Sequence, residues 1–235
     1  MKIVIPSKGR AGILYERAFK LFPEALVCVG ESDVADYSKV TKNLLVHPDD
    51  VTGIGPLRQW ILDNVEDEIV VQVDDDVHSL YSLTGFSKKT LDTPRIAARV
   101  IATTALCAQD SGARVFGFNQ TWDVRKFMPF KPFLLNSWTG GVIGVIGKSL
   151  RFDTFLKLRA DIDFCLQSLM KDRFVWIENR YSFVHKRWAG SGGNASNRSE
   201  ARHKEEIEYL QRKWGKYLKV QDTKTTTRLV MQVPR

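Results

Sequence analysis

Three adjacent aspartates, Asp74, Asp75 and Asp76, follow directly on the apolar run at residues 69–73, Ile-Val-Val-Gln-Val. Apolar residues of this kind belong inside a sheet, whereas carboxylates belong in water or on a cation. The change of residue type therefore predicts that a strand leaves the core here, at the edge of a sheet where α/β proteins bind ligands.

Two of these carboxylates could share one face, because side chains alternate along a strand and Asp74 and Asp76 are two residues apart. Carboxylates that close repel each other unless a cation or bound protons offset their charge. Mg2+ or Mn2+ would fit best, and such ions usually complete their coordination with water and substrate phosphates. The alternative is an acidic turn that caps the next helix.

A first candidate for nucleotide binding is the turn Ser7-Lys8-Gly9-Arg10, which follows a short apolar run and Pro6. Its backbone amides and two cations could receive a base, a ribose or phosphates. The turn is neither a phosphate-loop lysine motif nor a three-glycine dinucleotide fingerprint. This argues against a P-loop ATPase and a dinucleotide-dependent dehydrogenase, and a simple tight turn is the alternative.

A second candidate phosphate contact lies at a glycine-rich helix start, where Gly53, Gly55 and Arg58 are close in sequence. Pro56 supports a helix start here, because proline is favoured in a first turn. The alternative is a loop followed by an ordinary surface arginine.

Two further carboxylates, Asp161 and Asp163, fall where another helix is expected to begin. Asp163 could cap the helix or complement its dipole. Asp161, just ahead of it, could face a cleft as a general base and take a proton from an attacking hydroxyl. Both are candidate catalytic residues, and a structural role for both is the alternative.

A late histidine, His185, follows a strand-like segment at residues 181–184 and precedes Lys186 and Arg187. A neutral imidazole could supply a nitrogen ligand to the same cation, and either basic side chain could steady a departing diphosphate. The alternative for an isolated histidine is a satisfied structural role.

The elements that would position these residues alternate between strand and helix over the first 76 residues, which predicts a parallel sheet with right-handed crossovers. The predicted strands here are residues 2–5, 25–29, 44–47 and 69–73, separated by helices at 12–22, 33–40 and 53–64. Further on we predict a helix from Thr93-Pro94, strands at 115–118, 140–147 and 174–178, a helix at 162–170, and a charged helix from Ser199 to about Leu218 before a Thr-rich strand or tail.

Composition is that of a globular protein, because 43% of the 235 residues are hydrophobic and 26% are charged. This length supports one substantial core, and we expect one domain with a basic tail region. The formal charge of +8 favours an anionic partner: a phosphate-bearing small molecule, nucleic acid or an acidic surface.

Other classes are disfavoured. No apolar stretch reaches the length of a signal peptide or a membrane span, so we expect a soluble, intracellular protein with no membrane partner. The three cysteines, Cys28, Cys107 and Cys165, are odd in number and widely spaced among apolar neighbours. They are predicted to be buried free thiols rather than disulfides or a zinc site.

The order of these features resembles the GT-A class of nucleotide-sugar glycosyltransferases along nearly the whole chain. More narrowly, the chain resembles the bacteriophage TET-associated glycosyltransferases, which add sugars to hydroxymethylated pyrimidines in DNA. The resemblance implies an α/β GT-A (Rossmann-like) fold, with a mostly parallel central sheet flanked by helices in a single domain. The expected divisions are a domain at residues 1–220, with a nucleotide-binding half at 1–78 and an acceptor-binding half at 79–198, and a basic C-terminal helix and tail at 199–235.

The resemblance also implies site roles. Asp74 and Asp76 would bind Mn2+ or Mg2+ and the diphosphate, with Asp75 as a substitute for either and His185 completing the metal's coordination. Asp161 matches the base of inverting members, although Ala160 stands where their pattern usually has glutamate. The donor, a UDP-sugar by preference, would contact Pro6, Ser7, Lys8, Arg10, Gly55, Arg58, Asp74, Asp75, Lys186 and Arg187.

For a DNA acceptor, the aromatic and cationic stretch at 122–133 could stack or wedge bases, while late cations meet phosphates. Chemistry on a duplex base generally requires flipping it out of the stack. The alternative is that the aromatics are core and the late helix is a solvated mixed-charge face, since Glu205, Glu206 and Glu208 interleave its cations. The predicted acceptor set is Trp122, Arg125, Lys126, Trp138, Gly140, Gly141, Arg198 and Arg202.

The expected function is therefore metal-dependent transfer of a sugar from a nucleotide sugar to the hydroxyl of a hydroxymethylated pyrimidine in double-stranded phage DNA, in the cytoplasm of an infected bacterium. One alternative is a glycan or other non-DNA acceptor. A nucleotidyltransferase is disfavoured, because that class usually opens with a glycine-rich phosphate loop, which the first residues of this sequence lack. A non-catalytic DNA-binding module would leave the acidic triplet unexplained.

Overall fold

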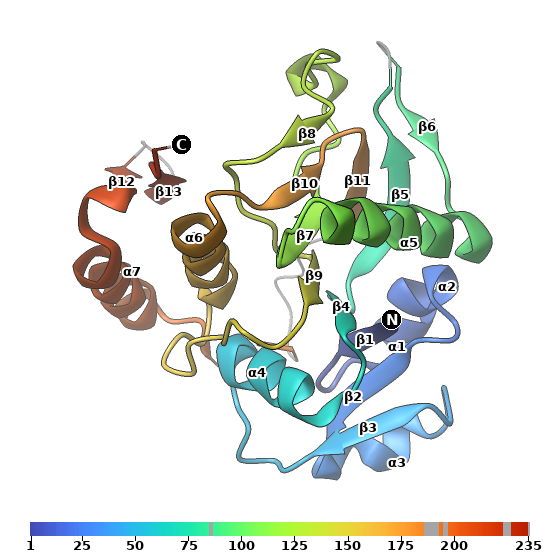
Figure 1. Cartoon of the computed structure of the whole chain (residues 1–235). Helices are drawn as coiled ribbons and strands as arrows, with labels where there is room; N and C mark the ends of the chain where they lie inside the picture. The colour runs from blue at the N-terminus through green and yellow to red at the C-terminus, as the bar shows by residue number, and fades with distance from the viewer. Residues whose placement is uncertain (85–86, 186–192, 195–196, 223–226, 235) are drawn as a thin grey trace.

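The computed structural model of the chain describes residues 1–84, 87–185, 193–194, 197–222 and 227–234. Its centre is an eight-stranded sheet in the order β3-β2-β1-β4-β9-β7-β10-β8, with helices on both faces (Figure 1). The expected α/β class with a mainly parallel, helix-flanked central sheet is confirmed.

The first half of the sheet is parallel. Strands β1 (Lys2–Pro6), β2 (Leu26–Gly30), β3 (Leu44–His47) and β4 (Ile69–Val73) pair side by side in one direction. Their near-continuous apolar runs are typical of parallel strands covered on both faces. Val4 and Ile5, adjacent on β1, enter two different core clusters, one on each face.

The connections in this half are helical. They are α1 (Ala11–Glu16), α2 (Ala18–Leu21), η1 (Glu31–Asp33), α3 (Val34–Tyr37) and α4 (Ile54–Asn64). The single helix predicted at residues 12–22 is wrong, because Arg17, with φ −125° and ψ −99°, leaves helical geometry between α1 and α2.

The second half of the sheet is mixed. Strand β9 (Val142–Ile146) runs antiparallel to both β4 and β7 (Val115–Phe118). Strand β10 (Trp176–Glu178) is parallel to β7, and the short β8 (Phe133–Leu134) closes the edge antiparallel to β10. Strand–helix alternation predicts parallel pairing, and only the first half of the sheet is parallel throughout.

The glycine-rich strand makes the close approach that its sequence predicts. A Cβ atom on Gly144 would lie 2.1 Å from the ring of Phe116 on the neighbouring strand β7. Because Phe116 is fully buried, its ring has no free space into which to move.

Substituting Gly144→Ala is therefore expected to lower the free energy of unfolding by about 1–3 kcal/mol, the usual cost of overpacking a core. Urea denaturation followed by circular dichroism measures it. Gly12→Ala is the matched control, since a Cβ atom there meets nothing within 4 Å. Equal stability of the two variants would contradict this account of the β7–β9 contact.

A second, three-stranded antiparallel sheet was not predicted. It contains β11 (Tyr181–His185), β5 (Val77–Ser82) and β6 (Lys89–Thr90). Strand β5 begins directly after the acidic triplet, and its pairing with β11 is irregular between Val184 and His185, where His185 lies opposite Val77. This pairing brings the end of β11 back to the triplet.

Helices cover the central sheet on both sides (Figure 1). The long α5 (Pro94–Asp110) shares one core cluster with α1 and α2, and α4 and α6 (Ala160–Asp172) share the other. Thr93 caps α5 as its sequence predicts, its side chain accepting a hydrogen bond from the amide of Ile96.

The C-terminal segment packs against α6. Helix α7 (Glu200–Trp214) is followed by η4 (Gly215–Tyr217) and the hairpin β12 (Leu218–Asp222) and β13 (Thr227–Met231). Leu210, Leu218 and Val233 belong to the same core cluster as the apolar side of α6. Residues of the predicted basic tail are thus integrated into the main core.

Two further expectations can be compared with the structure. No helix within the described ranges is long and apolar enough to cross a membrane. All three cysteines are free thiols, as predicted. Cys28 and Cys165 are buried, but Cys107 is exposed, because it lies on the outer face of α5.

Candidate active site at the ends of the strands

The acidic triplet lies at the end of β4, where its three carboxylates have different surroundings. Asp74 accepts a hydrogen bond from Arg58 Nη2 at 2.9 Å, and its side chain is one-third exposed. Asp75 is buried and accepts from Ser7 Oγ at 2.6 Å and from Arg10 Nη1 at 3.4 Å. Burial, and then the charges of Asp74 and Asp75, raise the pKa of Asp76 to about 7. The carboxylate of Asp75 is therefore occupied by hydrogen bonds from the turn after β1, whereas the carboxylate of Asp74 is partly exposed to solvent.

His185 packs against the backbone beside this triplet. A Cβ atom on Gly141 would lie 2.5 Å from His185 Nδ1, and the carbonyl of Gly141 accepts a hydrogen bond from the amide of Asp74 at 2.8 Å. His185 Nδ1 is buried and has no hydrogen-bond partner among the described residues. The fold therefore brings together residues that lie more than 100 positions apart in sequence.

The chemistry of these side chains fits a divalent cation. Burial, and then the charges of Asp74 and Asp75, disfavour the ionised form of Asp76, and a bound cation would favour that form again. The unpartnered imidazole nitrogen of His185 adds a suitable neutral ligand. Within the described part of the chain, no three His, Cys, Asp or Glu side chains are gathered closely enough to form a metal cluster. The assignment of Asp74, Asp76 and His185 as ligands of a metal ion therefore stays a prediction.

Arg58 occupies the centre of the site. It is 2% exposed, so the alternative of an ordinary surface arginine is excluded. Its Nη2 atom donates both to Asp74 Oδ1 and to the carbonyl of Gly140 at 3.0 Å. Its Nε and Nη1 atoms are buried without a hydrogen-bond partner among the described residues. A buried guanidinium with unused donors is costly unless a ligand meets it.

Asp161 lies beside Gly140, whose carbonyl shares the guanidinium of Arg58 with Asp74. A Cβ atom on Gly140 would be 2.8 Å from Asp161 Oδ2, and Asp161 Oδ1 accepts from the amide of Ile162. Burial raises the pKa of Asp161, while the positive charge of Arg58 opposes that rise. Asp74, Arg58, Gly140 and Asp161 therefore form one polar cluster at the ends of the strands.

Asp163, the second catalytic candidate, points elsewhere. It is fully buried and accepts from Lys213 Nζ at 2.8 Å, from Trp214 Nε1 at 2.9 Å and from Gln167 Nε2 at 2.7 Å. These partners lie on α6 itself and at the end of α7. The geometry favours a structural role, in which Asp163 ties α7 to the first turn of α6.

Replacing Asp163 by Ala should lower the free energy of unfolding by about 1–3 kcal/mol, because the indole N–H of Trp214 would lose its acceptor and Lys213 would keep Asp153 alone as its ionic partner. Chemical denaturation measures this. Asp36→Ala is the control, since its bond to Lys39 joins two well-exposed side chains and should contribute little to stability. A loss no greater than that of the control would refute the structural role.

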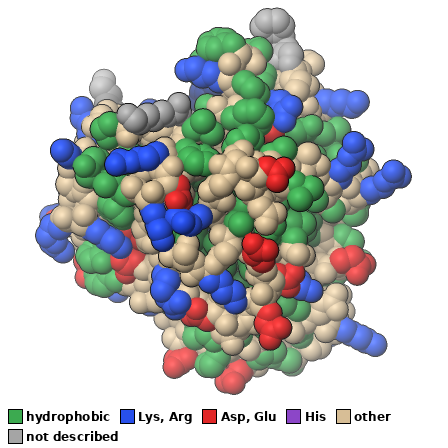
Figure 2. Space-filling view, viewed as in Figure 1, with side chains coloured by type: hydrophobic (Ala, Val, Ile, Leu, Met, Phe, Trp, Pro, Cys, Tyr) green, Lys and Arg blue, Asp and Glu red, His purple; other side chains and the backbone are tan. Residues whose placement is uncertain are grey.

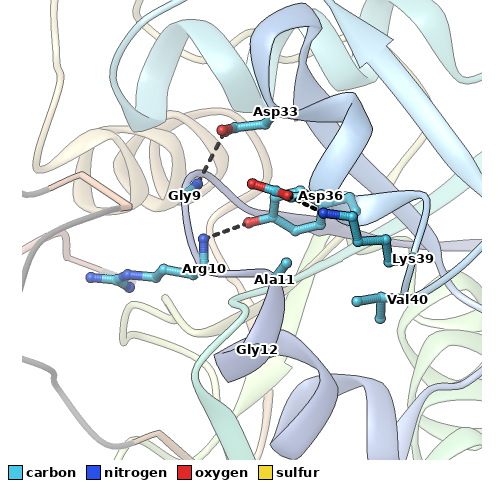
Figure 3. Close-up of a pocket in the computed structure, with 9 residues that line it drawn as sticks. Gly9, Arg10, Ala11, Gly12, Asp33, Asp36, Lys39 and Val40 are labelled. Atoms are coloured by element: carbon cyan, nitrogen blue, oxygen red, sulfur yellow. Dashed lines mark hydrogen bonds and ion pairs between the residues drawn. The ribbon is translucent and has the colours of Figure 1, made fainter.

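The turn after β1 borders a cavity of about 430 Å3 (Figure 3). Two of its amides are already used, because Gly9 donates to Asp33 Oδ2 and Arg10 to the hydroxyl of Tyr37. The side chain of Arg10 points away from the cavity, toward Asp75. The cavity is lined by Gly9, Arg10, Ala11, Gly12, Asp33, Asp36, Tyr37, Lys39 and Val40.

Tyr37 was missed by the sequence analysis. Its hydroxyl is 2.6 Å from Ser7 Oγ and also accepts from the amide of Arg10, so it fixes the turn. The available signal was its helical spacing from Val34, three residues earlier, because two apolar side chains on one face of a helix indicate burial.

The other predicted donor contacts are placed as follows. Pro6 ends β1, and Lys8 is exposed in the turn. Gly55 packs against backbone, since a Cβ atom there would lie 2.2 Å from the carbonyl oxygen of Leu156. Lys186 and Arg187 lie outside the described residues.

The predicted acceptor residues fall into three places. Gly140, Gly141 and Trp138 are at the site, the ring of Trp138 lying 3.2 Å from a Cβ atom on Gly140. Trp122 is 52% exposed, and Lys88 Nζ lies 4.4 Å from the centre of its ring. In the same loop, which includes η2 (Val124–Lys126), Arg125 makes a paired contact with Asp123 and Lys126 is exposed.

The third place is the start of α7, where Arg198 lies just before the helix and Arg202 lies in its first turn. Arg202 Nη1 is 3.0 Å from Glu205 Oε2. Lys and Arg side chains gather on the side of the molecule where α7 lies (Figure 2). These two arginines thus belong to a different segment from the loop of Trp122, which carries exposed cations of its own in Arg125 and Lys126.

The mainly parallel sheet, with an acidic triplet at the end of β4 and Asp161 at the start of α6, defines a fold of the GT-A nucleotide-sugar transferase class. Glucosyl-3-phosphoglycerate synthase from Mycobacterium tuberculosis, solved in complex with Mg2+ and UDP, matches this fold with a TM-score of 0.52 at 10% identity, over 99% of this chain and 86% of that chain. The sequence model of the TET-associated glycosyltransferases matches residues 1–194. The chain belongs to that family.

A second similar structure matches at a lower TM-score than the synthase. TarS 1–349 from S. aureus, in complex with UDP-GlcNAc, has a TM-score of 0.49 and 16% identity, over 87% of this chain and 64% of that chain. The chain spans between 37% and 64% of the length of the TarS structures that it matches. No curated protein sequence matches the chain.

Proposed function

We propose that the chain transfers a sugar from a nucleotide-sugar donor, with Mn2+ or Mg2+ bound, to the hydroxyl of a hydroxymethylated pyrimidine in double-stranded DNA. The observation that carries the proposal is the cluster of Asp74, Arg58 and Asp161, which gathers a partly exposed acidic group and a candidate base around Gly140. Membership of the TET-associated family supports the DNA acceptor.

On the donor side, Asp74, Asp76 and His185 would hold the metal ion. When bound, that ion would neutralise the charge that gathers on the leaving diphosphate. Arg58 fixes the carboxylate of Asp74, and its unused N–H groups could donate to an anionic ligand. UDP in the complexes of similar folds supports a UDP-sugar as donor. Ser7, Lys8 and Arg10 would contact the nucleotide in the proposed nucleotide-binding half, residues 1–78.

On the acceptor side, Asp161 would take the proton of the attacking hydroxyl. Burial raises its pKa, which strengthens it as a base, and Oδ2 faces Gly140 while Oδ1 is held by the amide of Ile162. In the proposed acceptor half, residues 79–198 of a domain at 1–220, the exposed ring of Trp122 could stack on a base displaced from the duplex. Such an enzyme would act in the cytoplasm of an infected bacterium.

The test is transfer to DNA of known composition. Duplexes containing 5-hydroxymethylcytosine or 5-hydroxymethyluracil are incubated with the protein, Mn2+ and a panel of UDP-sugars, then digested and weighed by mass spectrometry. We expect the modified nucleoside to gain the mass of one sugar and the matched duplex with ordinary pyrimidines to gain none. Transfer to glycans or proteins alone would show that the acceptor is wrong, and no transfer to any acceptor would remove the enzymatic proposal.

A further inference from the structure

Glu206, in the middle of α7, holds backbone that belongs to another part of the chain. It is fully buried, and its carboxylate accepts hydrogen bonds from the amides of Lys157, Leu158 and Arg159 at 2.7–3.2 Å. The alternative of a solvated acidic side chain is excluded at this position, because the three amides satisfy the carboxylate inside the protein.

The same backbone segment also holds the start of α4. The carbonyl oxygens of Leu156 and Lys157 accept from the amides of Gly55 and Ile54, each at 3.1 Å. These are first-turn amides of α4, which have no partner within their own helix. We call residues 156–159 the strap: its carbonyls cap α4, its amides are bound by Glu206, and α6 begins at its end.

Both helices that meet the strap carry a side chain of the proposed active site. Arg58 lies one turn after the capped amides of α4, and Asp161 lies two residues after the strap, in the first turn of α6. The two side chains converge on Gly140, whose carbonyl accepts from Arg58 and whose Cα faces Asp161 Oδ2. A shift of the strap would move one relative to the other.

No local cap replaces Glu206. Arg159, the N-cap residue of α6, makes no side-chain capping bond, and Gly53, the N-cap residue of α4, has no side chain to offer. Serine, threonine, asparagine or aspartate usually supply this bond. The start of α4 therefore depends on the strap, whereas the first turn of α6 has one local bond, from the amide of Ile162 to Asp161 Oδ1.

We propose that Glu206 is a positioning residue, which fixes the strap and through it the relative placement of Arg58 and Asp161. The inference rests on the proposed transfer reaction for its effect on rate. It makes α7, which lies beyond the residues matched by the family model, part of the framework of the active site.

Glu206→Gln is the discriminating substitution. The glutamine side chain keeps the size of glutamate but presents an NH2 group to an amide donor, so at least one strap amide loses its acceptor. A displacement of about 1 Å at reacting groups can reduce a rate about 100-fold, so we expect kcat to fall at least about tenfold.

Leu210→Ala is the matched control. Leu210 is fully buried one turn further along α7, in the same core cluster as Leu156, and its truncation leaves a cavity but removes no hydrogen bond from the strap. Both variants are compared with the unchanged protein at a temperature where circular dichroism shows all three folded. Two quantities are measured: kcat with a UDP-sugar, Mn2+ and hydroxymethylated DNA, and amide hydrogen exchange of peptides covering residues 53–58 and 156–162.

We expect Glu206→Gln to accelerate exchange in both peptides and to lower kcat, and Leu210→Ala to keep kcat within about twofold even where it loses more stability. The proposal is overturned if kcat of the folded Glu206→Gln variant equals that of the control, or if exchange at the strap is unchanged. If the unchanged protein transfers no sugar, the reaction itself is refuted, and the exchange measurement still decides whether Glu206 holds the strap between α4 and α6.

Discussion

Asp76→Ala is expected to abolish sugar transfer while leaving the fold intact. Loss of a metal ligand removes stabilisation of the leaving diphosphate, and a loss of about 4 kcal/mol would lower kcat about 1,000-fold. The fold should tolerate the change, because burial and the charges of Asp74 and Asp75 already disfavour the ionised form of Asp76. Steady-state transfer rates and thermal unfolding followed by circular dichroism measure the two effects.

The control is Asp110→Ala, which removes an exposed carboxylate at the end of α5 and should change neither quantity. Calorimetric titration with Mn2+ and UDP separates binding from chemistry: the Asp76 variant should bind the pair more weakly than the control does. A variant that turns over at the normal rate would exclude Asp76 from the metal site.

A strand is predictable from sequence where its pattern is local. Strands β3, β4 and β7 begin and end at the predicted residues, because each is an apolar run bounded by polar or glycine residues. Strand β5 was missed because the acidic triplet is itself the turn before it, with the amide of Val77 donating to the carbonyl of Asp74, and an acidic turn here was considered only as the cap of a following helix. Its partner β11 lies about 100 residues further along the chain, so no local signal could indicate the pairing.

The direction of β9 was also beyond local patterns. Its glycine-rich sequence predicts a strand with close neighbours, and the contact of Gly144 with Phe116 agrees with that prediction. Whether a strand runs parallel or antiparallel depends on the path of the chain that leads to it. In this fold the segment before β9 arrives from the loop after β7 without a crossover helix, which allows the reversed direction.

The residues of the candidate site also fall into two groups, those that local sequence patterns predict and those that depend on distant contacts. The triplet and the turn after β1 follow apolar strands, so strand-end reasoning could find both, and their link through Ser7 and Asp75 follows from β1 lying beside β4. The burial of Arg58 and the bond between Glu206 and the strap depend on contacts between distant helices. Sequence periodicity marks which residues face inward, but it does not identify the polar partner that makes burial of a charge tolerable.

Asp161→Asn is expected to be the second large effect. The amide keeps the size of the carboxylate and can still accept from Ile162, but it cannot take a proton from the acceptor hydroxyl. Loss of a general base should reduce kcat about 100- to 10,000-fold, with little change in donor affinity. Rapid-quench measurement of transfer, beside calorimetry with UDP and Mn2+, checks both statements.

The Asp161→Asn substitution should lower kcat without lowering the stability of the fold. Because burial raises the pKa of Asp161, its ionised form is disfavoured in the folded chain, and a neutral isostere should unfold at the same urea concentration or a higher one. Asp163→Asn, two residues further along the same helix, provides the contrast: it should lose stability through Lys213 and keep kcat. If the Asp163 variant lost transfer and the Asp161 variant kept it, the base would have to be reassigned. The Asp74–Arg58–Gly140 cluster would then bind donor alone.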